Sequence, residues 1–208
     1  SVVPFVRRVS VGPGDGRPQN HRRRFCYPGS NDRSGPGPHR RNWAAYFRCA
    51  IPPVDENYHF RKDLIRELSY WWRAGDGDVL LFGPTGSGKT SLFEQWCACL
   101  GIPLFMAKGH RRFEPMEAFG QFVGGENGVT PWVDGPVTLA ARFGLPCIIN
   151  EYDRIASDRA IVFNDVFESR AFPIPGRAGE VVSPQPGFRV ALTANTNLIQ
   201  DLTGNYGT

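Results

Sequence analysis

The sequence predicts an α/β fold in which a parallel sheet is flanked by helices on both faces. Short apolar runs alternate along the chain with segments whose apolar residues recur at helical spacing. Strands of a parallel sheet are apolar throughout because both of their faces are covered, and alternating strands and helices produce such a sheet. A glycine-rich segment joins one strand to the next helix, and two later strands end in polar residues.

Helical periodicity predicts helices over 60–74, 89–100 and 137–143, and apolar runs predict strands over 78–82, 103–107, 146–150 and 188–194. Two hairpin insertions are expected, one within 119–133 around a turn cluster at 124–128 and one over 172–182. A further helix is expected to begin with Asp158 as its cap and to turn Ile161, Val162, Val166 and Phe167 inward.

The N-terminal part differs in composition from the rest. Residues 1–48 contain ten Arg and two Asp, whereas the chain of 208 residues has a net charge of only +4, so the remainder is slightly acidic. Six Pro and six Gly interrupt residues 1–40. We therefore expect a basic, disordered Gly/Pro-rich tail over 1–48 and a folded core over 49–208. Contact between this tail and nucleic acid is the alternative to a merely solvated extension.

Two classes of protein are excluded or disfavoured by composition. A membrane span is not expected because the sequence has no run of about 18 apolar residues. The five Cys are odd in number and lack the spacing of a disulfide framework. A reduced, cytoplasmic location is the better interpretation.

A nucleotide site is predicted by the segment between the strand at 78–82 and the helix at 89–100. It fits the pattern G-x-x-x-x-G-K-[ST] in full through Gly83, Pro84, Thr85, Gly86, Ser87, Gly88, Lys89 and Thr90. Glycines let backbone N–H groups close around phosphate oxygens, and the helix N-terminus adds partial positive charge. Lys89 is expected to reach the β- and γ-phosphates of ATP, and the Thr90 hydroxyl is expected to coordinate Mg²⁺.

The strand at 146–150 is the second element of this site. Polar residues follow its apolar stretch at the carboxyl end, where open α/β sheets bind ligands. Glu151 is the candidate general base that orients the attacking water. Asn150 occupies the position where an Asp usually holds the metal, so we expect weaker Mg²⁺ affinity and slower turnover. Asp153 follows three residues later, and the sequence does not say whether it points inward.

The strand at 188–194 supplies the third element. Asn195 follows its apolar stretch, and an amide at this position could hydrogen-bond the γ-phosphate or the catalytic water as a sensor. An Asn-rich turn is the simpler alternative for this residue.

These motifs, in this order, resemble the AAA+ ATPases. The resemblance is to their MoxR and dynein-related branch, and within it to the proteins similar to the cobaltochelatase small subunit. It covers residues 50–208 and rests on Gly83–Thr90, Ile149–Asp153, Pro186–Arg189 and Thr193–Thr196.

The resemblance implies a P-loop NTPase core that acts in a ring, commonly a hexamer, and uses Mg-ATP hydrolysis to remodel a protein partner. It also implies that the two hairpins project toward the ring pore or a partner, and that the partner often carries a von Willebrand A-type domain. The chain stops at Thr208, ahead of the expected arginine finger, second sensor and helical lid. These 208 residues are therefore expected to bind nucleotide but to hydrolyse it poorly, the helical lid being missing.

Three functions remain as hypotheses. The first is the ATP-binding core of a MoxR-like ATPase, and the second is a nucleic-acid-associated ATPase anchored by the Arg-rich tail. The third, motivated by Asn150 and the end of the chain, is a nucleotide-gated assembly module without hydrolysis. A small-molecule kinase is disfavoured because the sequence has no compact acceptor-binding lid.

Overall fold

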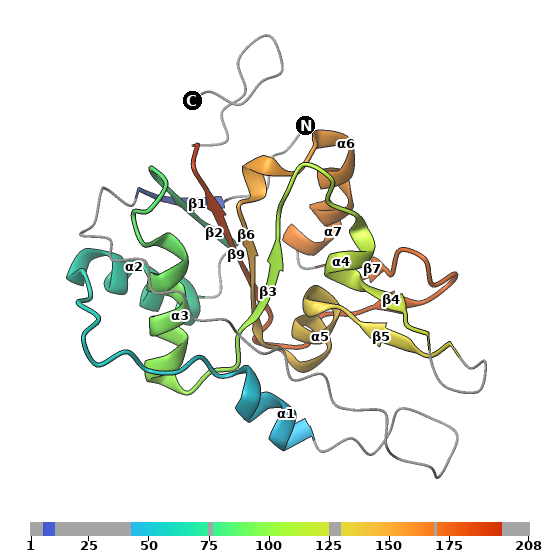
Figure 1. Ribbon diagram of the computed structural model, residues 1–208, viewed down its shortest axis with the longest axis horizontal. Coiled ribbons are helices and arrows are strands. Elements are labelled where there is room, and N and C mark those ends of the chain that lie inside the picture. Colours follow the sequence, from blue (N-terminus) through green and yellow to red (C-terminus); the bar gives the residue numbers. More distant parts are fainter. Residues whose placement is uncertain (1–5, 11–42, 75–76, 125–129, 169, 197–208) are drawn as a thin grey trace.

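The computed structural model describes residues 6–10, 43–74, 77–124, 130–168 and 170–196. Five parallel strands form one sheet in the order β1-β2-β9-β6-β3, and the expected α/β class is confirmed (Figure 1). The strands are β1 (Val6–Ser10), β2 (Asp78–Phe82), β3 (Phe105–Lys108), β6 (Pro146–Asn150) and β9 (Arg189–Ala194). No helix within these ranges is long and apolar enough to cross a bilayer.

Helices and two small antiparallel sheets surround the parallel sheet. The α-helices are α1 (Trp43–Ala50), α2 (Lys62–Ala74), α3 (Lys89–Leu100), α4 (Pro115–Phe119), α5 (Pro136–Phe143), α6 (Ser157–Ala160) and α7 (Asn164–Phe167). The short 3₁₀ turns are η2 (Tyr152–Arg154) and η3 (Ile161–Phe163). The hairpins are β4 (Gly120–Phe122) with β5 (Trp132–Asp134), and β7 (Phe172–Pro173) with β8 (Val181–Val182).

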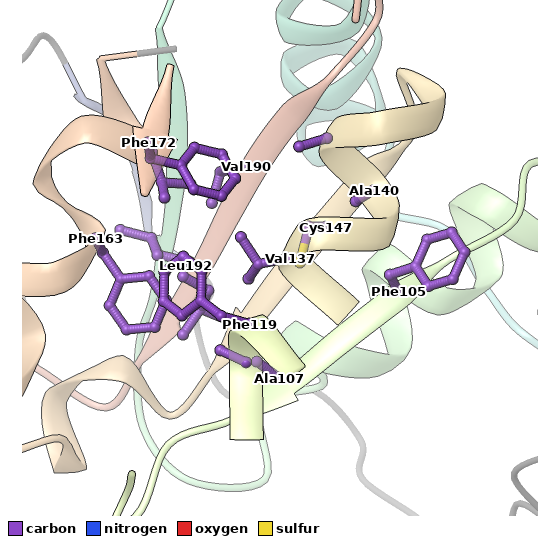
Figure 2. Packing of buried hydrophobic residues seen from close by; sticks show 14 of the residues in the cluster. Phe105, Ala107, Phe119, Val137, Ala140, Cys147, Phe163, Phe172, Val190 and Leu192 are labelled. Carbon is purple, nitrogen blue, oxygen red and sulfur yellow. The ribbon is translucent and has the colours of Figure 1, made fainter. Parts of the chain in front are cut away.

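Each face of the sheet has its own hydrophobic core. On one face α2 and α3 contribute Leu68, Trp71 and Phe93, among others, to a cluster with Leu81 and Ile148 of the strands. On the other face, aromatic residues from α4, η3 and β7 pack against β6 and β9, as Figure 2 shows for Phe119, Phe163, Phe172, Val190 and Leu192. Alternate residues of β6 and β9 therefore enter opposite cores, which explains why these strands are apolar throughout.

Two expectations about local structure are wrong. The range 1–48 was expected to be disordered, yet Val6–Ser10 pairs in parallel with β2 at the edge of the sheet, and α1 begins at Trp43. The strand has the sequence VRRVS, in which β-branched residues suit an edge position despite the arginines. The rest of that range, and residues 125–129 of the first hairpin, lie outside the described residues.

The helix expected from Asp158 is the second correction. The segment is divided into α6, η3 and α7, and α6 is preceded by Ala156 with no side-chain cap. Val166 is buried and Val162 and Phe167 are partly buried, as expected, but Ile161 is 65% exposed and Phe163 is fully buried. Phe163 packs against Phe119 and Phe113. The buried residues of this segment therefore do not form the single helical face that the sequence pattern predicted.

The strand order determines where the predicted motifs meet. β9 lies between β2 and β6, and all three run in the same direction. Their carboxyl ends therefore lie side by side at one edge of the sheet.

Candidate functional site: a phosphate loop facing two strand ends

The glycine-rich segment forms a loop between Phe82, the last residue of β2, and Lys89, the first of α3. Gly86 and Gly88 both have φ of +81°, a conformation that side-chain-bearing residues rarely adopt. The Ser87 hydroxyl oxygen is buried and has no hydrogen-bond partner among the described residues. A loop with this backbone at a helix N-terminus fits a phosphate group.

Lys89 connects this loop to the end of β9. Its Nζ donates hydrogen bonds to the carbonyl oxygens of Gly83 and Pro84, both at 2.9 Å, and to Asn195 Oδ1 at 3.1 Å. The residue is only 8% exposed, and this burial lowers its pKa, while the nearby carboxylates of Asp153 and Glu151 act in the opposite direction. The ammonium is thus placed where it can meet a phosphate within reach of the Asn195 amide.

Asn150 lies at the centre of a neutral hydrogen-bond network. Its Oδ1 accepts the hydroxyl protons of Thr90 at 2.8 Å and of Thr193 at 2.5 Å. The described residues contain no cluster of three or more His, Cys, Asp or Glu side chains that could hold a metal by itself. The Thr90 hydroxyl and the Asn150 carbonyl are nevertheless both oxygen donors of the type that Mg²⁺ accepts, provided that phosphates complete its shell.

Glu151 has an unusual backbone conformation. Its φ is +56°, and among the described residues it is the only one other than glycine with positive φ. Its N–H donates to Thr193 Oγ1 at 2.9 Å, and its carboxylate accepts a bond from Arg154 at 3.2 Å. The turn begins directly after β6, and the Glu151 carboxylate lies close enough to Lys89 to favour its charged form.

Three residues that shape the site were not assigned a definite role from the sequence. The Thr193 hydroxyl donates a hydrogen bond to Asn150 Oδ1 and accepts one from the Glu151 N–H. In the sequence, Thr193 is only a polar residue within an otherwise apolar strand. Asp153 points toward the end of β9, where its carboxylate accepts the N–H groups of Asn195 and Thr196. Asp153 therefore points inward, a direction that the sequence alone does not indicate.

Gly109, directly after β3, is the third residue. Its N–H donates to the Asn150 carbonyl at 2.6 Å. A Cβ at this position would lie 2.4 Å from the Glu151 carbonyl oxygen and 3.0 Å from that of Asn150. Only glycine permits this approach, and the signal in the sequence was a Gly directly after a strand.

Every predicted site residue is described, and the strand ends bring them together. Lys89 contacts Asn195, Thr90 contacts Asn150, and Glu151 and Asn150 are both held by Thr193. The arrangement offers backbone N–H groups and one ammonium to an anion, hydroxyl and amide oxygens to a cation, and the Glu151 carboxylate directly after the end of β6. Chemically, it can bind a polyphosphate with a divalent cation and deliver a base to its terminal group.

Comparison with known proteins gives relatives at the level of sequence. The chain is 35% identical over 124 residues to Protein NorQ of Paracoccus denitrificans, a match that covers 59% of this chain and 45% of NorQ. It is 32% identical to Protein CbbQ of Hydrogenophilus thermoluteolus, over 64% of this chain and 54% of CbbQ. It is also 29% identical to Gas vesicle ATPase GvpN2 of Halobacterium salinarum, over 60% and 42% of the two chains. The chain thus spans about half the length of the curated relatives that it matches.

A crystal structure of a candidate ATPase from Cytophaga hutchinsonii shares the fold, with a TM-score of 0.53 and 16% identity over 80% of this chain and 45% of that chain. Residues 78–203, which include the phosphate loop and both strand ends, match the family described as AAA domain (dynein-related subfamily). That match covers more than half of the chain and agrees with the MoxR-like relationship of its relatives. The chain therefore belongs to the dynein-related subfamily of AAA domains.

Proposed function

We propose that this chain is the ATP-binding core of a MoxR-like AAA+ ATPase that uses Mg-ATP hydrolysis to remodel a protein partner. The contact between Lys89 and Asn195 is the main support, because it joins the phosphate loop to a polar strand end 106 residues away. A simple anion-binding loop does not need this second contact. One of the relatives is named as a gas vesicle ATPase, which also supports hydrolysis.

The residues of the site divide the proposed chemistry among them. Backbone N–H groups of Gly86–Gly88 and the Lys89 ammonium bind phosphate oxygens, and Asn195 orients the terminal phosphate or the attacking water. Glu151 accepts the proton of that water, with its backbone held in place by Thr193. Thr90 and Asn150 would hold Mg²⁺, which neutralises charge on the phosphates when it is bound.

Assembly is part of the proposal. Family resemblance favours a ring, commonly a hexamer, in which an arginine of the neighbouring subunit completes the ATP site. The two hairpins, β4-β5 and β7-β8, are the proposed contacts with the remodelled protein or with a partner that carries a von Willebrand A-type domain. Exposed Met116, Phe122 and Val181 on and beside these hairpins support such a contact.

Phosphate release and nucleotide binding, measured side by side, test the proposed hydrolysis. We expect Lys89→Ala to lose both, and Glu151→Gln to keep binding while turnover falls by at least 100-fold. Glu168→Gln, which changes an exposed carboxylate on another segment, is the matched control and should behave as wild type. Undiminished turnover in Glu151→Gln would contradict the assignment of the base.

A nucleotide-gated assembly module without hydrolysis is the second candidate. It is favoured by the Thr90–Asn150–Thr193 network, which has no negative charge at the proposed metal position. Nucleotide-dependent oligomerisation in sizing experiments, with no phosphate release in the same samples, would favour this function over the first.

A further inference from the structure

Asp153 links the turn after β6 to the end of β9. Its Oδ2 accepts the backbone N–H of Asn195 at 2.9 Å and that of Thr196 at 3.2 Å. Both residues follow Ala194, the last residue of β9, where the ladder of the sheet no longer supplies acceptors for their N–H groups. One carboxylate oxygen thus fixes the first two residues beyond the strand.

The position of the Asn195 backbone determines what its side chain reaches. Asn195 is itself exposed, and its side-chain Oδ1 accepts a hydrogen bond from Lys89 Nζ. The bond from the Asn195 N–H to Asp153 therefore helps to hold the Asn195 amide beside the Lys89 ammonium. The second oxygen of Asp153, Oδ1, is buried and accepts no hydrogen bond from the described residues.

Charge gives Asp153 a second effect on the same site. Asn150 leaves the proposed metal position neutral, whereas Asp153 brings a carboxylate close enough to Lys89 to act on its charge. A bond between a carboxylate and N–H groups is stronger than one between neutral partners. The Asp153 carboxylate can therefore keep the backbone of Asn195 and Thr196 in place when the Asn195 side chain binds a phosphate.

We propose that Asp153 is a positioning residue that holds Asn195 toward the terminal phosphate, and that this contact makes the site prefer a nucleoside triphosphate to a diphosphate. The proposal rests on the proposed function above. Asp153 acts through Asn195, because its bonds reach the backbone of that residue. The competing explanation is that Asp153 only stabilises the turn.

Dissociation constants for Mg-ADP and for a non-hydrolysable Mg-ATP analogue test this proposal. They would be measured for wild type, Asp153→Ala, Asp153→Asn, Asn195→Ala and the Asp153→Ala/Asn195→Ala double variant. We expect Asp153→Ala and Asn195→Ala each to reduce the preference for the triphosphate about tenfold. The double variant should be no worse than either single one, because residues that act as one unit are not additive.

Asp153→Asn separates the hydrogen bonds from the charge, because its amide oxygen can still accept both N–H groups. A threefold loss of preference, smaller than that of Asp153→Ala, is expected, and this variant decides the matter if Asp153→Ala does not fold. Asp158→Asn, an exposed carboxylate on α6, is the control and should leave the preference unchanged.

Two results would overturn the inference alone: a lower melting temperature with an unchanged triphosphate preference in the Asp153 variants, or fully additive losses in the double variant. If wild type binds neither nucleotide, the proposed function fails and the inference fails with it. If wild type binds both and Asp153 variants do not alter the ratio, only the inference fails.

Discussion

Replacing Asn150 by Asp tests whether the neutral network limits the metal site. The Asn150 oxygen accepts hydroxyl protons from Thr90 at 2.8 Å and Thr193 at 2.5 Å, and an Asp side chain has nearly the same shape. Both bonds can therefore be kept while a negative charge is added. We expect Asn150→Asp to bind Mg-nucleotide more tightly and to hydrolyse it faster than wild type.

The size of the effect follows from the kind of hydrogen bond. A bond to a charged acceptor contributes about 1.5–3 kcal/mol, against about 0.5–1.5 kcal/mol for a neutral one. We expect the bonds to Thr90 and Thr193 to persist when nucleotide binds, so their strengthening largely cancels in the binding free energy. Only the increment felt by the cation or its water shell remains, about 1–1.5 kcal/mol, which corresponds to about tenfold in affinity.

The assay is a nucleotide titration in the presence of Mg²⁺ and, separately, of a chelator. We expect a tenfold gain in affinity with Mg²⁺ and no gain with chelator, because the added charge favours the cation and not the phosphates. Asn164→Asp makes the same exchange at an exposed residue of α7 and should change neither titration. Equal affinities for wild type and Asn150→Asp in Mg²⁺ would refute the reasoning.

Further predictions concern the packing that supports the site. Gly109→Ala should destabilise the fold by about 1–3 kcal/mol and slow turnover, because its Cβ would meet the Glu151 carbonyl at 2.4 Å. Gly124→Ala, whose Cβ would have no atom of the described residues within 4 Å, is the control in urea unfolding and phosphate release. Trp71→Ala should cost about 3–5 kcal/mol in the same unfolding experiment, because Trp71 is 1% exposed within the α2–α3 core. Burial raises the pKa of Asp78 to about 8, so its contribution to stability is full below pH 4 and is lost as the pH rises toward 8. Asp78→Asn should therefore stabilise the protein more at pH 8 than at pH 5, by a difference on the order of 4 kcal/mol in denaturant titrations; equal effects at both pH values would contradict this assignment.

The sequence predicts most of the elements that carry the site. The bounds of β2, β6 and α3 agree with the expectation at both ends, because apolar runs there meet glycine or polar residues abruptly. The meeting of Lys89, Asn150 and Asn195 follows from a general property of parallel sheets, whose carboxyl ends share one edge. Strong local patterns, combined with this rule about parallel sheets, were sufficient to predict that these three residues lie close together.

Other features depend on contacts between distant parts of the chain, and local patterns do not report these. The direction of Asp153 depends on the position of Asn195, which lies 42 residues later, directly after β9. The exposure of Ile161 follows from the burial of Phe163 against aromatic residues of other elements. The pairing of Val6–Ser10 with β2 spans 72 residues between Val6 and Asp78 and is not apparent from an arginine-rich segment.

The central claim is that the loop at 83–90 binds a triphosphate whose terminal group faces the ends of β6 and β9. Isothermal titration of a non-hydrolysable Mg-ATP analogue into wild type and Lys89→Met tests it most directly. Methionine keeps most of the buried side-chain volume while removing the ammonium that contacts Asn195. We predict micromolar binding by wild type and at least a hundredfold weaker binding by the variant at unchanged melting temperature; equal binding by the two proteins would contradict the account.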